Sequence, residues 1–373
     1  MKQILIYYYG LTQFKNSGDL LINKILLSLL VDRGILLIED RILPEAYKIN
    51  LLQGIQHKLL SNVTNKSFFL HLLLKSSVNF ITKKYDIYVI EPPGHLYEVR
   101  KKPTYRNHLR WIFNFFLYIS GCKRIRLGVS LGPYTKEFVR YNARMSKLYY
   151  AIGVRDNESL IYAKDNNFFN VRFIPDLAWS KILSPTRCSI ELPKKSYTLL
   201  SFRDCIIKDT RDDVYFEKLL RAIDLALPVV NDNVVLFYQT AYDRKTCIEL
   251  LERYRTNYSI DFIDKCLNPE EAGKLISKAN TVITNRLHIL IPSINQSVLT
   301  IALTDVEKHG KLRSIVADNN LNECLIDFND SISERIKLVN EQKEQIIQKF
   351  NQVSEEKNLE INKIVDEVFP KQF

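Results

Sequence analysis

The stretch ANTVITNRLHILI, residues 279–291, carries the pattern from which the fold of this chain can be predicted. Its first part, Ala279 to Thr284, is a short apolar run typical of a buried strand, and Ile289 begins a run typical of a helix. Asn285-Arg286-Leu287-His288 then forms a strand-to-helix turn, where backbone amides and the helix dipole favour an anion. The arginine can hold a phosphate or carboxylate, and the histidine can move a proton near neutral pH.

Segments typical of strands and helices alternate along the rest of the chain. Strand-like runs in the first half lie at residues 4–9, 35–38, 87–90, 125–129 and 151–154. A second series lies at residues 198–202, 234–238, 260–263, 281–284 and 298–303. The alternation predicts an α/β fold of two Rossmann-like domains with parallel sheets, and ligands are expected in a cleft between the domains.

The boundary between the predicted domains falls where the periodicity is lost, between Leu177 and Pro193. We therefore expect an N-terminal Rossmann-like domain over residues 1–187 and a C-terminal one over residues 188–330. The charged segment over residues 331–373 has apolar positions at helical spacing, which predicts a long C-terminal helix.

The composition is that of a globular protein with an anionic partner. The 373 residues are 46% hydrophobic and 25% charged, and the net charge is +11. Six scattered cysteines without a CxxC pair predict reduced thiols, with neither a zinc site nor a disulfide framework. No apolar run approaches the roughly 20 residues of a membrane span. We expect a cytoplasmic protein whose membrane contact, if any, is peripheral, on the inner face of the cell membrane.

Basic side chains follow several of the expected strands. Arg203 closes the first strand of the second half, Arg286 follows the strand quoted above, and Lys311 begins a helix after the last apolar strand. Because the carboxyl ends of parallel strands meet at one edge of a sheet, these cations are expected to surround one small anion. The alternative is that they are solvated surface charges, that Asn285 caps a helix and that His288 is a hydrogen-bonded core residue.

Aromatic and basic residues are interleaved from His108 to Arg126. This combination suits an anionic bilayer surface or a lipid-linked substrate, although a buried helix under the first sheet is the simpler explanation. Single-stranded nucleic acid uses the same residue types, but the sequence has no RNA- or DNA-binding motif. We therefore expect no nucleic-acid partner.

Taken in order, five short segments resemble motifs of the polysaccharide pyruvyl transferase family. They are Asn-x-Gly-Asp at residues 16–19, Ser-x-Gly-Pro at 130–133, Val-Arg-Asp at 154–156, Pro-Asp at 175–176 and Arg-Leu-His at 286–288. Lys311 aligns with the family's lysine after the last strand, and the similarity spans roughly residues 4–320. The order and spacing of the segments carry the resemblance, because each motif alone is short.

The resemblance implies a GT-B-like fold and a reaction. The donor is phosphoenolpyruvate, and its pyruvyl group is transferred to a sugar of a surface, capsular or exopolysaccharide to form a pyruvate ketal. His288 is then the general acid that protonates C3 of the donor. Arg203, Arg286, Leu287 and Lys311 are the donor-binding residues.

The resemblance also indicates the acceptor side of the reaction. Asn16, Asp19 and His95 are the candidates for orienting or deprotonating the acceptor, a saccharide that the basic charge allows to be linked to polyprenyl phosphate. No metal and no cofactor are expected, because phosphoenolpyruvate is itself a substrate.

Two other functions fit the same sequence. A GT-B glycosyltransferase that uses a nucleotide sugar in polysaccharide biosynthesis would share the fold and the basic site. A non-enzymatic anion-binding or scaffold protein on an acidic membrane would show no loss of turnover when His288 is replaced. The response of the protein to phosphoenolpyruvate and to nucleotide sugars separates these possibilities.

Overall fold

The computed structural model describes residues 2–98, 100–183, 193, 196–207, 210–230 and 232–370. The chain forms two compact units. The first consists of Met1–Phe14, Ile22–Leu177 and Leu359–Phe373, and the second of Lys15–Leu21 and Ala178–Asn358. The predicted boundary between residues 187 and 188 lies outside the described residues. Two segments belong to a different unit from the residues around them in the sequence. Residues 15–21 are part of the second unit, and residues 359–373 are part of the first.

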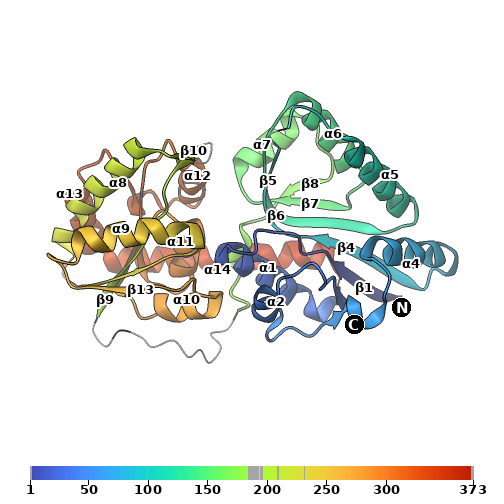
Figure 1. Cartoon of the computed structure of the whole chain (residues 1–373), viewed down its shortest axis with the longest axis horizontal. Coiled ribbons are helices and arrows are strands. Elements are labelled where there is room, and N and C mark those ends of the chain that lie inside the picture. The colour runs from blue at the N-terminus through green and yellow to red at the C-terminus, as the bar shows by residue number, and fades with distance from the viewer. Residues whose placement is uncertain are drawn as a thin grey trace. The chain divides into compact units, whose positions relative to one another are not determined.

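The first unit is built on an eight-stranded parallel sheet in the order β3-β2-β1-β4-β6-β7-β8, with β5 paired to β6 (Figure 1). Its strands are β1 (Gln3–Tyr8), β2 (Ile35–Ile38), β3 (Lys58–Leu59), β4 (Tyr85–Glu91), β5 (Gly94–Glu98), β6 (Lys123–Tyr134), β7 (Ala151–Val154) and β8 (Val171–Phe173). Its α-helices are α1 (Ser17–Leu30), whose first residues group with the second unit, α2 (Glu45–Leu52), α3 (Leu60–Val63), α4 (Phe68–Thr82), α5 (Tyr105–Ile119), α6 (Lys136–Ser146) and α7 (Asn157–Asp165). Nearly all of β1 is buried, as expected for an apolar strand in a parallel sheet with helices on its faces.

The second unit contains a six-stranded parallel sheet in the order β13-β12-β9-β14-β15-β16 and a short antiparallel pair, β10-β11. Its strands are β9 (Tyr197–Ser201), β10 (Ile206–Ile207), β11 (Thr210–Arg211), β12 (Asn233–Phe237), β13 (Ile260–Ile263), β14 (Thr281–Thr284), β15 (Leu299–Thr304) and β16 (Leu325–Asp327). Its α-helices are α8 (Asp213–Ala226), α9 (Arg244–Tyr254), α10 (Pro269–Ile276), α11 (Leu287–Asn295), α12 (Gly310–Asp318) and α13 (Ile332–Glu341). The predicted α/β class with parallel sheets is therefore confirmed.

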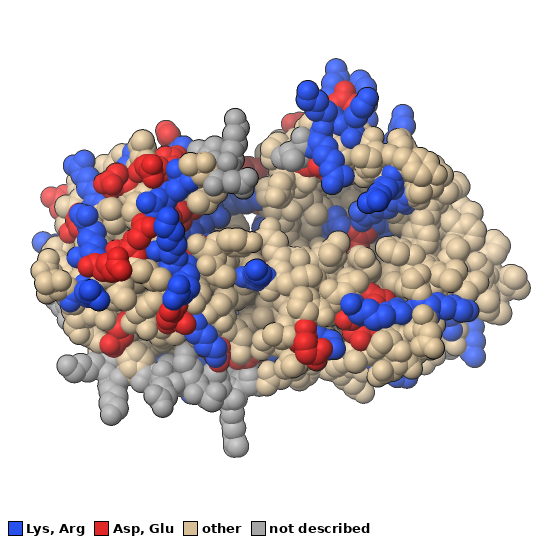
Figure 2. Space-filling view, in the orientation of Figure 1, with Lys and Arg blue, Asp and Glu red and all other residues tan. Residues whose placement is uncertain are grey.

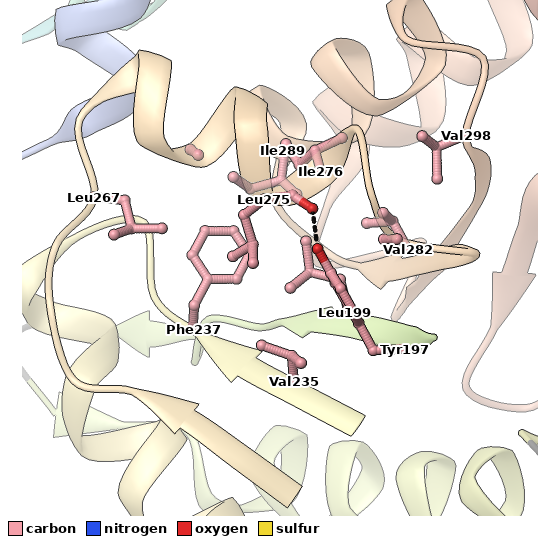
Figure 3. Close-up of a cluster of buried hydrophobic side chains, with 12 residues drawn as sticks. Tyr197, Leu199, Val235, Phe237, Leu267, Leu275, Ile276, Val282, Ile289 and Val298 are labelled. Carbon is pink, nitrogen blue, oxygen red and sulfur yellow. Dashed lines mark hydrogen bonds between the residues drawn. The ribbon is translucent and has the colours of Figure 1, made fainter. Parts of the chain in front are cut away.

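One core of the second unit lies between its sheet and α10 (Figure 3). Apolar side chains of β9 and β12 pack against α10, and the Tyr197 hydroxyl donates a hydrogen bond to the Leu275 carbonyl at 2.6 Å. The helix begins at a capping box in which Asn268 and Glu271 satisfy each other's backbone amides, followed by Pro269 at the first helical position. Local sequence thus fixes where α10 begins, and burial fixes which face meets the sheet.

The predicted long C-terminal helix is α14 (Lys343–Val368), which has 26 residues and follows α13 after a break at Gln342. Its residues up to Asn358 group with the second unit and those from Leu359 with the first, so one helix belongs to both units. One of its faces is buried, at Ile346, Phe350, Ile361 and Val365 among other positions. The apolar spacing in the charged segment therefore marks a packed face.

Candidate active site

The carboxyl ends of four adjacent strands in the second unit meet in register. Thr284 of β14 lies opposite Ser201 of β9 and Ala302 of β15, and β12 pairs with the other side of β9. The residues that follow these strands therefore lie at one edge of the sheet. Arg203 follows β9 and Arg286 follows β14, so the structure brings these two predicted donor-binding residues together.

Asn285 holds the Arg203 backbone in place. Its side-chain carbonyl accepts a hydrogen bond from the Arg203 amide at 2.8 Å, and its amide nitrogen donates to the Arg203 carbonyl at 2.9 Å and to the Tyr215 hydroxyl at 2.8 Å. Asn285 was considered above as a helix cap, but its side chain instead links the ends of two neighbouring strands. This buried amide is a direct physical reason why Arg203 sits beside the turn that contains Arg286.

The Arg286 side chain is 14% exposed and already has an anionic partner. Its guanidinium forms an ion pair with Asp243 and donates to the Thr240 hydroxyl at 3.4 Å, while its buried Nε has no hydrogen-bond partner within the described residues. Sequence reasoning missed Asp243. The only signal available was the Thr-x-x-Asp pattern of a capping box after β12, which the structure shows at Thr240 and Asp243.

His309 is a second histidine at this edge and was also missed. Arg203 Nε donates to its Nε2 at 3.2 Å, and its Nδ1 contacts the Thr304 hydroxyl. Burial, together with the charges of Arg203 and Arg286, lowers the pKa of His309 to about 3, so the imidazole is neutral. The same environment lowers the pKa of Arg203 to about 10, with burial as the largest cause and Arg286 the next. A neutral His309 thus orients the Arg203 guanidinium by accepting its hydrogen bond.

His288 packs directly against the start of α1, within the segment of residues 15–21 that groups with the second unit. A Cβ atom on Gly18 would lie 2.5 Å from His288 Nδ1 and 2.7 Å from Gln239 Nε2, so only glycine permits this approach. The Ser17 hydroxyl donates to the Gln239 carbonyl at 2.7 Å, which fixes the segment to the loop after β12. His288 is partly exposed and departs from helical geometry within α11, at φ −84° and ψ 16°.

Asn16 and Asp19 lie in this same segment of the second unit. The Asn16 side chain accepts from the Gly18 amide at 2.9 Å and donates to Asp19 at 3.2 Å, in the manner of a helix cap. Both residues had been predicted on the acceptor side in the N-terminal domain. The structure groups them instead with His288 and the predicted donor-binding residues.

The remaining predicted donor-binding residues flank the same edge. Leu287 is the first residue of α11, and Lys311 is the second residue of α12, which follows β15. Both are partly buried. His95 belongs to the first unit, on β5, where its Nε2 contacts the Gly132 carbonyl at 2.5 Å.

The other segments that resemble the family form a buried network in the first unit. Arg155 forms an ion pair with Asp176 at 2.7 Å and donates to the Ser130 hydroxyl at 2.9 Å. Ser130 donates to Asp156, which also caps α7. These motif residues therefore bind one another and have a structural role in the first unit.

The described residues contain no group of three or more histidine, cysteine or acidic side chains able to hold a metal ion. Cysteines 122, 205, 247, 266 and 324 are free thiols. No helix in the described part of the chain combines the length and apolar content needed to cross a bilayer.

Similar solved structures define the class of fold. A glycosyltransferase from Rickettsia africae matches with a TM-score of 0.57 and 11% identity, over 100% of each chain. The UDP-GlcNAc 2-epimerase of Neisseria meningitidis, solved with UDP-GlcNAc, matches with a TM-score of 0.54 and 12% identity over 99% of this chain and 100% of that one. S. aureus MnaA, solved with UDP, gives 0.52 and 12% over 98% and 94%. The fold is thus that of GT-B glycosyltransferases and sugar-nucleotide epimerases, which confirms the predicted fold class.

The family of the chain is a more specific assignment than its class of fold. The family model described as polysaccharide pyruvyl transferase matches residues 16–305, well over half of the chain. The protein therefore belongs to the polysaccharide pyruvyl transferase family, as its ordered motifs predicted. No curated protein matches the sequence. Membership of the family makes the chain a transferase of polysaccharide biosynthesis, with a saccharide as acceptor.

Proposed function

We propose that this protein transfers the pyruvyl group of phosphoenolpyruvate to two neighbouring hydroxyls of a saccharide, forming a pyruvate ketal. The observation that carries the proposal is the cationic edge of the second unit, where Arg203 and Arg286 follow adjacent strands and His288 lies in the turn after Arg286. Lys311 follows the next strand of the sheet. Phosphoenolpyruvate carries a phosphate and a carboxylate on a three-carbon unit, and such a compact anion needs several cations within a short distance.

Charge and orientation support binding of the donor at this edge. The two guanidiniums are partly balanced by Asp243, so positive charge remains for an incoming anion. Arg203 is held through its backbone by Asn285 and through its Nε by His309. Donors that are already positioned bind an anion without the cost of ordering long side chains.

His288 is the better of two candidates for the general acid. The second unit contains two histidines, His288 and His309. His309 has its pKa lowered to about 3 and its Nε2 engaged by Arg203, so at neutral pH it is not the imidazolium that a general acid needs to be. His288 is partly exposed, beside Gly18 and at the start of α11.

The proposed reaction proceeds in two additions at C2 of the donor. His288 gives a proton to C3, and the vinyl π electrons form the new C–H bond, leaving C2 as an oxocarbenium-like centre. One sugar hydroxyl adds to C2 and loses its proton. The C2–O bond to phosphate then breaks, phosphate leaves with the electron pair, and the neighbouring hydroxyl closes the ketal with loss of a second proton. The first hydroxyl proton passes to Asp19, our candidate base, and from there restores the proton that His288 gave to C3. The second hydroxyl proton leaves with hydrogen phosphate.

Binding of phosphoenolpyruvate rather than a nucleotide sugar is the first test. The melting temperature of the purified protein is measured with phosphoenolpyruvate and with UDP- and GDP-sugars. A ligand at a hundredfold excess over its dissociation constant stabilises the folded state by about 2.7 kcal/mol. We expect a shift with phosphoenolpyruvate that Arg286→Ala abolishes. Arg253→Ala serves as the matched control, because Arg253 pairs with Asp224 on the surface of the same unit.

A nucleotide-sugar glycosyltransferase is the second candidate, because the solved structures of similar fold include one with UDP and one with UDP-GlcNAc. A thermal shift with UDP- or GDP-sugars and none with phosphoenolpyruvate would favour it. The role of His288 is tested separately by His288→Gln. This variant should bind phosphoenolpyruvate normally but lose release of phosphate in the presence of a saccharide acceptor. Normal release would remove His288 as the acid.

A lipid-linked acceptor is supported by an apolar face on the first unit. Helices α4 and α5 lie side by side, with Phe69 and Phe113 in edge contact at 5.3 Å between ring centroids. One face of α5 packs into the core of the first unit, as in the buried helix considered above, and its other face is exposed. Large apolar side chains of both helices are exposed: Phe69, Leu70, Leu74, Val78, Phe80, Ile81, Tyr105, Leu109, Ile112, Phe115, Phe116, Tyr118 and Ile119.

The charges around this face suit an anionic bilayer. Neither α4 nor α5 contains an acidic residue, and five basic residues lie within or directly after them: Lys75, Lys83, Lys84, Arg106 and Arg110. The end of the unit that carries these helices is largely free of charged side chains in Figure 2. Apolar insertion ringed by cations is the usual chemistry of peripheral membrane binding. We propose that this face binds the cytoplasmic surface of the membrane, where a polyprenyl-phosphate-linked acceptor would be reached.

Flotation with lipid vesicles tests the membrane contact. The protein should float with vesicles of phosphatidylglycerol at low salt and remain behind with phosphatidylcholine. The double variant Ile81→Glu, Ile112→Glu should lose binding, whereas Ile161→Glu, at a comparably exposed position on α7, should retain it. Dimerisation in solution that the same double variant abolishes, without vesicle binding, would assign the face to a second copy instead.

A further inference from the structure

A cavity of about 250 Å³ lies within the first unit, between β5, α5, β6 and α6. Aromatic side chains line much of it, including Tyr97, Tyr134, Tyr141 and Phe168. His95, predicted above as an acceptor-side residue, also lines it. Figure 2 shows a hollow on this unit, beside α5, with basic side chains at its edge. The volume suits a single sugar ring, and aromatic faces pack well against the apolar C–H face of such a ring.

The polar wall of the cavity has more positive than negative charge. The Glu91 carboxylate forms ion pairs with Arg124 and Arg126 and lies 3.4 Å from Arg110. Three guanidiniums therefore share one carboxylate. Arg110 and Arg126 line the cavity directly, and Arg124 is 2% exposed behind them.

Two of these guanidiniums have donors that are unsatisfied within the described part of the chain. Arg124 Nη1 and Arg126 Nε are buried and have no hydrogen-bond partner there. An unmet donor on a buried cation costs more free energy than one on a neutral group, so the cluster without a ligand is destabilised. An anion in the cavity would add the missing negative charge to the cluster and an acceptor beside Arg126, which lines the cavity.

The phenol of the neighbouring Tyr149 lies in the positive field of the same three guanidiniums. Burial opposes ionisation of its phenol, yet the combined charge of Arg124, Arg126 and Arg110 lowers its pKa below the ordinary value. The Tyr149 hydroxyl also donates to Glu91 at 2.9 Å, so the tyrosine does not neutralise the cluster. The local field therefore favours negative charge even where burial disfavours it.

We propose that this cavity binds the anionic group of a sugar, a phosphate or a carboxylate, with Arg110 and Arg126 as its direct partners. The sugar ring then packs against the aromatic wall. The inference rests on the proposed function in one respect, because it assigns the bound sugar to the acceptor. It makes the acceptor an acidic or phosphorylated saccharide, which the family assignment alone does not specify.

Calorimetric titration with four probes tests the inference: glucose 1-phosphate, glucuronate, methyl glucoside and inorganic phosphate. We expect binding of at least one of the two anionic sugars and none of methyl glucoside at the same concentration. Binding of glucose 1-phosphate alone assigns a phosphate, and binding of glucuronate alone a carboxylate. Equal binding of methyl glucoside, or binding of inorganic phosphate as tight as that of the sugars, would overturn the assignment.

Matched variants locate the site. Arg110→Gln and Arg126→Gln should each weaken binding of the anionic sugar about tenfold or more, the loss of one charge-assisted hydrogen bond. Arg110 is half-exposed, so Arg110→Gln should leave the other ion pairs of Glu91 in place. This variant therefore tests the site even if Arg126→Gln proves unstable. Arg106→Gln, an exposed arginine on the same helix but outside the cavity, is the control. Unchanged affinity in Arg110→Gln and in a folded Arg126→Gln would refute the site.

Phosphoenolpyruvate distinguishes failure of this inference from failure of the proposed function. Arg110→Gln should keep the thermal shift with phosphoenolpyruvate, and Arg286→Ala should lose it while keeping the anionic sugar. Loss of the phosphoenolpyruvate response in Arg110→Gln would mean that the donor occupies the cavity, and would overturn the assignment to the acceptor.

Discussion

Replacing Gly18 by alanine is the sharpest test of how the candidate site is assembled. The added Cβ would lie 2.5 Å from His288 Nδ1, 3.1 Å from His288 Cβ and 2.7 Å from Gln239 Nε2. The Gln239 amide is the end of a flexible side chain and can move aside. His288 meets the new methyl group near its own Cβ, so its ring must shift with the start of α11.

The size of the effect follows from these distances. Carbon and nitrogen atoms are in ordinary contact at roughly 3.5 Å, so the ring of His288 must move by about 1 Å. Overpacking of this kind costs about 1–3 kcal/mol, and alanine in a helix recovers up to about 1 kcal/mol relative to glycine. We expect a net loss of about 1 kcal/mol, or a fall in melting temperature of about 1 °C for a chain of 373 residues. Misplacing a reacting group by about 1 Å can lower turnover by about a hundredfold.

The assay compares turnover, binding and stability in one set of variants. Turnover is the release of phosphate from phosphoenolpyruvate in the presence of saccharide acceptors, and binding of phosphoenolpyruvate is measured by calorimetry. Gly273→Ala is the matched control, because its Cβ in α10 would meet only Gln296 Nε2, at an ordinary 3.7 Å. This control should be as active as the wild type and at least as stable.

The expected turnover of Gly18→Ala is specific. Gly18→Ala must lose turnover while remaining folded, and must come close to His288→Gln in activity. Wild-type turnover in a folded Gly18→Ala protein would show that the position of His288 relative to this segment is unimportant. An equal loss of turnover in Gly273→Ala would show that the effect is a general one of added bulk.

Three further changes test the supports of the site and of the first unit. Asn285→Ala removes three side-chain hydrogen bonds, two of them to the Arg203 backbone, and should lower the free energy of unfolding in urea by about 2–3 kcal/mol and weaken phosphoenolpyruvate binding. The pKa of His309 is about 3 in the folded protein and 6.5 ordinarily, so between these values the unfolded state binds more protons and stability falls as the pH falls. From pH 7.5 to 5.5 the wild type should therefore lose about 1.4 kcal/mol more than His309→Gln, and equal losses would contradict the assignment of His309 as neutral. Asp176→Asn deprives the buried Arg155 of its charge partner and should destabilise the protein by about 3–5 kcal/mol, and an unchanged melting temperature would show that the pair is not needed.

The arrangement of strands was predictable from sequence to the extent that it depends on local pattern. Apolar runs without alternation are typical of parallel strands buried on both faces, and the runs at β9 and β14 were found this way. The rule that functional residues follow the carboxyl ends of such strands then pointed to Arg203 and Arg286. The rule identified residues that lie together because β9 and β14 are hydrogen-bonded neighbours. This order of strands cannot be read from any local sequence pattern.

The partners of these arginines could not be predicted, because they depend on contacts between distant residues. Asp243 is 43 positions from Arg286, and His309 is 106 positions from Arg203. The same reason explains the place of Asn16. The sequence puts it directly after the first strand, whereas hydrogen bonds from its neighbour Ser17 to Gln239 join the segment to the second unit.

The cluster of arginines beside the cavity of the first unit is explained by the register of its strands. Glu91 of β4 lies opposite Arg126 of β6, and Arg124 is two residues earlier on the same strand. Alternate residues of a strand share a face, so both arginines meet the one carboxylate, and a shift of one residue would place them on the opposite face. Balanced ion pairing for stability would need as many carboxylates as guanidiniums, yet three guanidiniums share Glu91. A stabilising role therefore accounts for only one of the three positive charges, and the charge that is left over is best explained by an anion that binds from outside the protein.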